Sequence, residues 1–265
     1  MDSLTALRLQ IEWGVDEALE AEPVNRMLAE PVNRMLAEST IARPAPAVVQ
    51  AASVPRPASR PAGAAQRAQV AAAAARTLDE LRDAVAGFDG CGLSATATSL
   101  VFSDGNPESG LMLVGEAPGA EEDRTGKPFA GPSGQLLDRM LASVGLGRTQ
   151  CLLTNIIPWR PPGNRNPTET EVVVCLPFVL RHIALVRPRH LVLLGGLATQ
   201  AILGSKGGIM RQRGRWVEAL IPGLDAPVAT LPMLHPLYFL GSPASKALAW
   251  ADMLSLRRAL DSTAK

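Results

Sequence analysis

The sequence predicts an α/β fold in which helices cover both faces of a mostly parallel, four-stranded sheet. Four short apolar runs of strand length alternate with stretches of helical period. This alternation favours parallel pairing, because each crossover carries the chain back over one face of the sheet. The composition, 47% hydrophobic but only 4% aromatic, supplies a largely aliphatic core. We therefore expect a three-layer α/β/α sandwich.

Each expected element has its own pattern. The strands are expected at 111–114, 151–157, 191–194 and 228–234, and the helices at 134–144, 169–186, 197–203 and 243–260. A further helix is expected after Thr77, because Thr77 and Glu80 match a capping box ahead of an apolar run. Thr168 and Glu171 repeat this pattern at the start of the helix over 169–186.

The chain changes character near residue 77. Residues 1–38 contain an amphipathic stretch, expected to be a helix, and the octapeptide AEPVNRML twice in succession. Residues 39–76 are rich in Ala, Pro and Arg and contain no acidic residue. Such a segment buries too little apolar surface to offset its ordering entropy. We therefore predict a disordered linker over 39–76, followed by one domain over 77–265.

Composition and charge narrow the class of protein. The net charge is only +1, so any nucleic-acid partner has to be met by a local basic face. Three scattered cysteines do not suggest a disulfide framework and fit a reducing compartment. No apolar run is long enough for a bilayer span, and no signal peptide is recognisable. We expect a cytoplasmic monomer.

Polar and aromatic residues follow every expected strand. The run at 111–114 ends in GEAPG and leads into GKPFAGPSG, the run at 151–157 ends in TNIIPWRPPGNR, and the last run ends in HP. The carboxyl ends of parallel strands meet at one edge of the sheet, where ligands bind. A carboxylate and an aromatic ring framed by Gly and Pro suit a flat, polar ligand. The spacing does not match a phosphate-binding loop.

The motifs GEAPG-x-x-ED-x-x-G-x-PF-x-G-x-x-G, TN-x-x-x-x-RPP-x-NR and HP-x-x-x-L occur in this order. Together they resemble the family 4 uracil-DNA glycosylases of the uracil-DNA glycosylase superfamily, from about Cys91 to the C-terminus. The resemblance implies the fold of that superfamily. It also implies hydrolysis of the N-glycosidic bond of uracil in DNA, with the base flipped into a pocket and an abasic site left behind.

The resemblance assigns roles to residues of this chain. Phe129 matches the stacking aromatic and Asn155 the amide that reads uracil, and Ala117 and Gly119 are expected to line the same site. His235 matches the histidine that hydrogen-bonds uracil O2 as charge builds on the leaving base. Glu116 and Glu122 are both candidates to position the water, and the sequence does not choose between them.

Contacts to DNA are expected from four further residues. Arg160, Arg165 and Lys246 are candidates for phosphate contacts, and Leu237 is a candidate wedge for the gap that a flipped base leaves. Gly241 stands where relatives commonly carry an arginine. The alternative reading is therefore a catalytically impaired relative that binds nucleic acid.

The cysteine pattern departs from the family. Members usually hold a four-iron cluster through four cysteines, and here only Cys91 and Cys175 match. The other two positions are occupied by Phe88 and Trp159. We therefore expect no ordinary cluster, no metal and no cofactor requirement for catalysis. We further expect apolar packing at Phe88 and Trp159 to pin the segment around residue 88 to the loop around 159–175.

Overall fold

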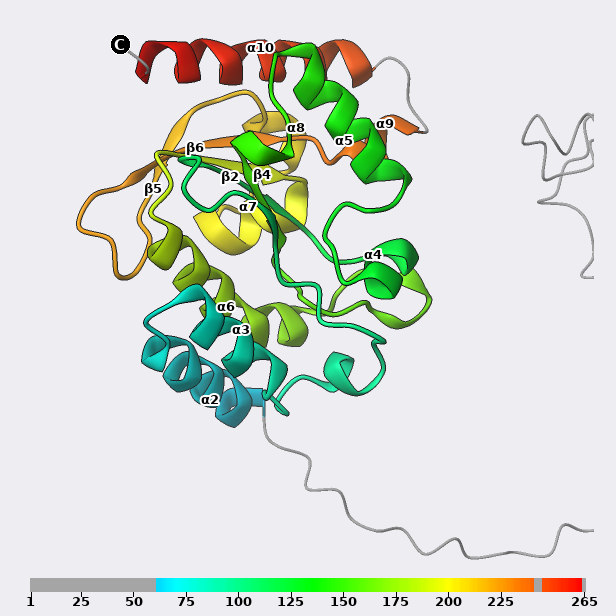
Figure 1. The fold of residues 1–265 in the computed structure, drawn as a ribbon, viewed down its shortest axis with the longest axis vertical. Coiled ribbons are helices and arrows are strands. Elements are labelled where there is room, and N and C mark those ends of the chain that lie inside the picture. Colours follow the sequence, from blue (N-terminus) through cyan, green and yellow to red (C-terminus); the bar gives the residue numbers. More distant parts are fainter. Residues whose placement is uncertain (1–60, 241–244, 264–265) are drawn as a thin grey trace, which may run out of the picture. The chain divides into compact units, whose positions relative to one another are not determined.

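A single six-stranded sheet forms the centre of the fold (Figure 1). The computed structural model describes residues 61–240 and 245–263, which belong to one compact unit. The strand order is β1-β3-β2-β4-β6-β5. The strands are β1 (Asp104–Gly105), β2 (Leu111–Gly115), β3 (Leu152–Asn155), β4 (His190–Leu194), β5 (Val217–Ala219) and β6 (Val228–Met233).

The four predicted strands are the parallel centre of this sheet. β3, β2, β4 and β6 pair in parallel, and Gly115 of β2 lies opposite Asn155 of β3 at the end where the site residues gather. The sheet also has two short antiparallel edge strands, β1 and β5, which the sequence analysis missed. With two and three residues, they are too short to show an alternating pattern.

Helices cover both faces, as predicted (Figure 1). Alternate residues of β2 enter different core clusters: Met112 and Val114 pack with α2, α3 and α6, and Leu111 and Leu113 pack with α5 and α10. The helices are α2 (Pro61–Ala74), α3 (Leu78–Ala86), α4 (Ala120–Thr125), α5 (Pro132–Ser143), α6 (Glu169–Val186), α7 (Gly196–Leu203), α8 (Ile209–Gln212), α9 (Pro236–Leu240) and α10 (Ser245–Thr263), with short 3₁₀ turns η2 (Gly92–Ala95), η3 (Arg148–Gln150) and η4 (Pro162–Asn164).

The two expected helix starts are present. Thr168 and Glu171 form the predicted capping box at the start of α6. At the start of α3, the Thr77 hydroxyl accepts from the Glu80 amide at 3.1 Å. The Glu80 carboxylate, however, accepts from the Arg76 amide at 2.6 Å, so the second half of that predicted box is replaced by a neighbouring bond.

The prediction of a disordered linker over 39–76 is wrong for its last part. Residues 61–74 form α2, which packs along α6 and buries Ala64, Ala68 and Ala72. Alanine is the strongest helix former, and its small side chain lets two helices approach closely, so a low apolar content does not prevent docking here. The Arg181 side chain of α6 also donates to the Ala75 carbonyl at 2.6 and 2.9 Å.

Other sequence predictions lie outside the described residues. These are the N-terminal helix and duplicated octapeptide within 1–38, residues 39–60 of the linker, and Gly241. No helix within the described part of the chain has the length and apolarity of a membrane span.

Candidate active site

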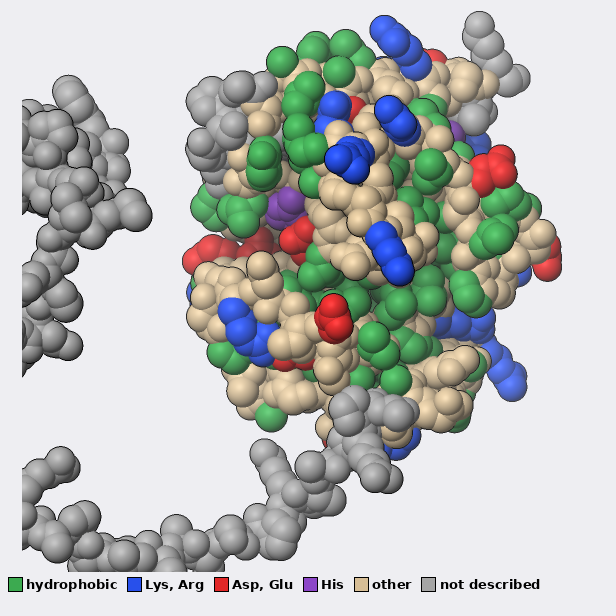
Figure 2. Space-filling view, turned by 180° about the vertical axis from the view of Figure 1, so that it is seen from behind, with side chains coloured by type: hydrophobic (Ala, Val, Ile, Leu, Met, Phe, Trp, Pro, Cys, Tyr) green, Lys and Arg blue, Asp and Glu red, His purple; other side chains and the backbone are tan. Residues whose placement is uncertain are grey.

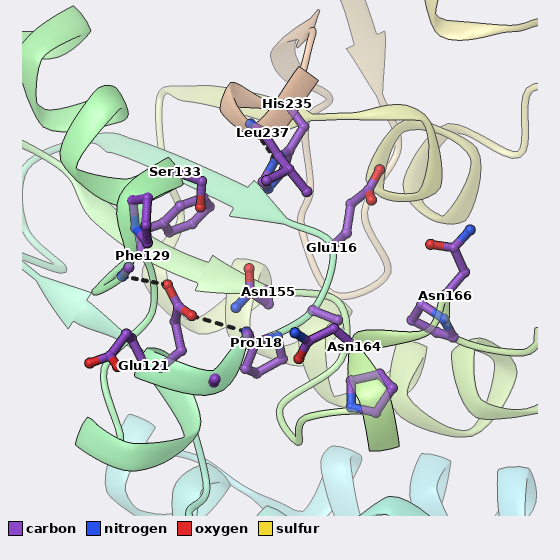
Figure 3. Close-up of a pocket in the computed structure, with 18 of the residues that line it drawn as sticks. Glu116, Pro118, Glu121, Phe129, Ser133, Asn155, Asn164, Asn166, His235 and Leu237 are labelled. Atoms are coloured by element: carbon purple, nitrogen blue, oxygen red, sulfur yellow. Dashed lines mark hydrogen bonds between the residues drawn. The ribbon is translucent and has the colours of Figure 1, made fainter. Parts of the chain in front are cut away.

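A cavity of about 380 Å³ opens where β2, β3 and β6 end (Figure 3). Glu116 directly follows β2, Asn155 ends β3, and His235 follows β6. Phe129 reaches the same cavity from the loop between α4 and α5. The structure therefore brings together the four side chains on which the sequence argument rested. Ala117, Gly119 and Glu122 also line this cavity.

The Phe129 ring is buried. Only 4% of the residue is exposed, and its ring centroid lies 5.9 Å from that of His235 at an interplanar angle of 24°. Its backbone has φ 55°, a left-handed conformation that is uncommon outside glycine. Two glycines make room for it. A Cβ at Gly115 would collide with the ring and with Asn155, and one at Gly134 would collide with the Phe129 carbonyl.

Glu116 is held at the start of α7. Its Oε1 accepts from the Leu197 amide at 3.1 Å. Burial raises the pKa of the Glu116 carboxyl, and backbone hydrogen bonds from Leu197 and Gly196 oppose this rise. Gly195 has φ 100°, and a Cβ there would collide with the carboxylate. The Gly-Gly pair after β4 thus lets a carboxylate approach the backbone at the edge of the pocket.

Glu122 is engaged by the backbone. Its Oε2 accepts from the Gly119 amide at 3.0 Å and its Oε1 from the Gly131 amide at 2.8 Å. These two bonds tie the GEAPG turn to the loop that carries Phe129. Both oxygens of the Glu122 carboxylate therefore serve to shape the pocket wall.

The tautomer of His235 follows from its contact with α9. Its Nδ1 accepts from the Leu237 amide at 3.2 Å. Burial lowers the pKa of His235 to about 4, so the imidazole is neutral at pH 7. A neutral ring whose Nδ1 accepts a hydrogen bond carries its proton on Nε2. His235 therefore offers an uncharged donor.

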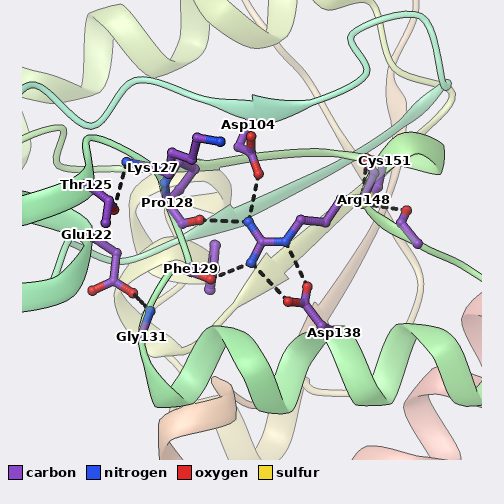
Figure 4. A network of polar contacts seen from close by, with 11 residues as sticks. Asp104, Glu122, Thr125, Lys127, Pro128, Phe129, Gly131, Asp138, Arg148 and Cys151 are labelled. Carbon is purple, nitrogen blue, oxygen red and sulfur yellow. Dashed lines mark hydrogen bonds and ion pairs between the residues drawn. The ribbon is translucent and has the colours of Figure 1, made fainter.

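Arg148 contacts the loop that carries Phe129, and the sequence analysis missed it. Its guanidinium donates to the Pro128 carbonyl at 3.2 Å and to the Phe129 carbonyl (Figure 4). Two carboxylates hold it there, with Asp104 at 2.7 Å and Asp138 at 2.9 Å. Arg148 thus fixes the backbone beneath the Phe129 ring. In the sequence, Arg148 is a single cation after Gly147, and nothing near it indicates which residues it contacts.

Two of the four residues expected to meet DNA lie at the pocket. Arg165 and Leu237 line it, and Leu237 is 63% exposed. Arg160 lies in the same loop as Arg165, and Lys246 is exposed on α10. In the face that Figure 2 shows, Lys and Arg side chains are spread out, not gathered in one dense patch.

The arginines of the loop already have protein partners. Arg165 binds both carboxylate oxygens of Glu171, at 2.9 and 2.6 Å, and this pairing lowers the pKa of Glu171 to about 2. The Arg160 Nε donates to the Asn164 side chain at 2.7 Å. A phosphate contact by either residue therefore has to share the guanidinium with these partners.

Comparison with known proteins decides the family. A sequence model of the uracil DNA glycosylase superfamily matches residues 102–254. The chain is 33% identical over 180 residues to the type-4 uracil-DNA glycosylase of Pyrobaculum aerophilum. The aligned residues make up 66% of this chain and 91% of the relative. It is 41% identical over 126 residues to that of Archaeoglobus fulgidus, 48% of this chain and 63% of the relative.

The chain belongs to the type-4 uracil-DNA glycosylases of the uracil DNA glycosylase superfamily. More distant matches include a type-5 uracil-DNA glycosylase of Mycobacterium leprae, which is 33% identical over 149 residues, 50% of this chain and 65% of the relative. The resemblance inferred from the motifs is thereby confirmed.

The residues at the expected cluster position do not fit the four-iron cluster of type-4 uracil-DNA glycosylases. Only two thiols meet there, with Cys91 Sγ and Cys175 Sγ 3.9 Å apart. Phe88 and Trp159 are 7% and 4% exposed and occupy the other two ligand positions. No group of three or more potential metal-binding side chains occurs in the described part of the chain.

Apolar packing occupies this position; that it pins the segment around residue 88 to the loop around 159–175 stays a prediction. Phe88, Trp159 and both cysteines belong to one core cluster, and the Phe88 ring meets Phe178 of α6 edge-on with centroids 5.1 Å apart. The Cys175 thiol donates to Cys91, which lowers the pKa of Cys91 to about 7 against the effect of burial. The same bond and burial raise the pKa of Cys175.

Proposed function

We propose that this chain hydrolyses the N-glycosidic bond of uracil in DNA and leaves an abasic site. The observation that carries the proposal is the convergence of Glu116, Phe129, Asn155 and His235 on one cavity. All four match the motif positions at which the resemblance places the family's chemistry. DNA is the macromolecular partner, and the base has to leave the stack to reach this cavity.

Recognition of uracil is assigned to Phe129 and Asn155. The ring would stack on the flipped base, and the amide oxygen of Asn155 would accept from uracil N3–H while its nitrogen donates to O4. Cytosine presents the reverse pattern, so a fixed amide leaves buried polar groups unpaired against it. The 6% exposure of Asn155 supports this role, because an unpaired group is costly only where water is excluded.

Bond cleavage is assigned to His235 and Glu116. The C1′–N1 bond breaks, its electrons pass to the base, and His235 Nε2–H hydrogen-bonds O2 where negative charge develops. The water oxygen then bonds to C1′, and its proton balances the charge on the departing uracil. The Glu116 carboxylate stabilises the cationic sugar or orients this water. No step requires a metal or a nucleotide cofactor.

Contacts to the strand are assigned to Arg160, Arg165 and Lys246, with Leu237 filling the gap left by the flipped base. The exposure of Leu237 beside the pocket supports the last assignment. We also propose that the enzyme acts as a cytoplasmic monomer. In support, all four central side chains come from one chain, and its three cysteines are free.

Uracil-containing oligonucleotides test the proposal directly. Single- and double-stranded substrates are incubated with the full chain and then treated with alkali, which breaks strands at abasic sites. We expect breaks at uracil that disappear in His235→Ala. Binding to uracil DNA without breaks would instead favour the alternative of a catalytically impaired relative.

A specificity variant tests the reading of the base. Asn155→Asp changes an amide donor to an acceptor, so we expect excision of cytosine to become detectable relative to that of uracil. The same oligonucleotides with cytosine in place of uracil measure this ratio. An unchanged ratio would remove Asn155 from base recognition.

A further inference from the structure

Two buried thiols lie in van der Waals contact at the position of the lost cluster. Cys91 and Cys175 are 3% and 1% exposed, and their Sγ atoms are 3.9 Å apart. A disulfide bond is about 2.0 Å long, so the two sulfurs have to approach by about 1.9 Å. Cys91 lies on the connection between α3 and β1, just before the short turn η2, and not within a long element. It is therefore the member of the pair that can move.

The pair has no third partner that would direct it to metal binding. No histidine, carboxylate or further thiol joins it to make a group of three among residues 61–240 and 245–263. Phe88 and Trp159 pack in the same cluster and supply only apolar contacts. Two-electron oxidation is the chemistry that two adjacent thiols retain without a metal.

We propose that Cys91 and Cys175 form a reversible disulfide, with a peroxide as the oxidant. The Cys91 thiol gives up its proton, and the resulting thiolate attacks one peroxide oxygen as the O–O bond breaks. The hydroxide that leaves takes up the released proton, so a sulfenic acid and a water form. Cys175 then attacks that sulfur, and the hydroxyl leaves as a second water with the Cys175 proton. Two thiols and one hydrogen peroxide thus give one disulfide and two waters.

The direction of this sequence follows from the observed contact. Cys175 donates its hydrogen to Cys91, and this contact stabilises negative charge on the Cys91 sulfur, so Cys91 is the member of the pair that reacts as a thiolate. Cys175 lies within α6 and is already adjacent to the sulfur that would be oxidised. Cys151 is different: it belongs to the other core cluster, donates to the Gly147 carbonyl, and burial raises its pKa to about 12.

The bond would link segments 84 residues apart and would replace the link that a cluster provides in relatives. Closing such a span restricts the unfolded chain, so we expect oxidation to raise the Tm by about 5–10 °C. Neither cysteine lines the active-site cavity. The disulfide is therefore independent of the proposed glycosylase activity and leaves its rate unchanged at moderate temperature.

Thiol counting and peptide mapping test the proposal on the full chain. The protein is treated with hydrogen peroxide, denatured, alkylated and digested without reduction. We expect accessible thiols to fall from three to one, a peptide pair joined through Cys91 and Cys175, and return to three with dithiothreitol. Three remaining thiols, or a joined pair that includes Cys151, would overturn the proposal.

Matched variants separate the pair from general oxidation. Cys151→Ser is expected to keep the joined peptide pair and the rise in Tm, whereas Cys91→Ser and Cys175→Ser lose both. Metal analysis of the purified chain completes the test. Stoichiometric iron or zinc that disappears in Cys175→Ser would show a ligand pair and would overturn the disulfide. The peptide map of the unsubstituted chain decides the question even if a variant fails to fold.

Discussion

The active-site pocket and the cysteine pair differ in what holds their side chains in place. In the pocket, directional bonds hold two of the four central side chains: Glu116 accepts from the Leu197 amide, and His235 accepts from the Leu237 amide. Around Cys91 and Cys175, the neighbours are rings and aliphatic side chains. Chemistry on a base tolerates little displacement of the reacting groups, whereas pinning two segments together only requires well-packed volume. Other residues can therefore replace the ones that pin two segments together more easily than the ones that perform the chemistry.

His235→Ala is expected to show the largest effect, because it removes a donor at the point of developing charge. We expect the excision rate to fall about 100- to 1000-fold, with the midpoint of urea unfolding nearly unchanged. Single-turnover kinetics on a uracil oligonucleotide measure the loss. If His235→Ala excises uracil at the unsubstituted rate, then His235 does not act as a donor in the reaction.

Phe88→Ala is expected to show the converse pattern. It empties a buried ring site, so we expect a loss of about 3–5 kcal/mol of unfolding free energy and an unchanged excision rate per folded molecule. Urea unfolding and the oligonucleotide assay measure the two quantities. Phe88→Leu keeps most of the volume and serves as the control. If Phe88→Ala lowers the excision rate by more than the loss of folded protein explains, then the packing around the cysteine pair also affects the active-site pocket.

His182→Phe tests how a buried imidazole in the apolar packing makes the stability of the fold depend on pH. His182 is buried, stacks on Phe102, and burial lowers its pKa from 6.5 to about 4. The unfolded chain takes up this proton near pH 6.5 and the folded chain only near pH 4, so stability falls as pH falls through this window. The imidazole thereby costs about 3 kcal/mol at pH 4.

The variant is expected to lose less unfolding free energy than the unsubstituted chain as the pH is lowered. Urea unfolding at pH 7, 5.5 and 4 measures this difference. Phenylalanine keeps the stacking on Phe102 and removes the buried Nε2, which lacks a hydrogen-bond partner among the described groups. His190 and His235 also have lowered pKa values, so some pH dependence remains. If the unfolding free energy of the variant depends on pH as that of the unsubstituted chain does, then the pKa of His182 is not lowered by folding.

Arg148→Lys is expected to show the smallest effect. A lysine cannot reach two carboxylates and two carbonyls with a planar fork, so the Phe129 backbone is held less firmly. We expect kcat/KM to fall about 10-fold with little change in stability. Arg124→Lys, in an exposed pair with Glu121 at 2.8 Å, is the matched control.

A double-substitution cycle gives this prediction its sharpest form. If Arg148 acts through the ring, Arg148→Lys has no further effect on kcat/KM in a Phe129→Ala background. If it only supports the fold, its effect adds to that of Phe129→Ala. The first outcome assigns Arg148 to the pocket, and the second places it with the general scaffold.

The parallel sheet and the central pocket residues were accessible from sequence because both leave short-range patterns. Apolar runs gave the four strands, and the residues after them gave Glu116, Asn155 and His235. Arg148 was not accessible, because its partners lie 10, 20 and 44 positions away and no spacing connects them. α2 was missed for a different reason: a face of alanines has no contrast in hydrophobicity, so it resembles a linker.

That alanine face also bears on the order in which the chain opens. α2 contacts α6 across about a hundred residues and buries mainly methyl groups, so little apolar area is lost when it detaches. β2 and β4, by contrast, are buried along their whole length. Regions with few buried apolar contacts exchange their amide hydrogens through local openings that leave the rest folded. Among the described elements, α2 should therefore exchange its amide hydrogens well before the sheet on which the pocket is built.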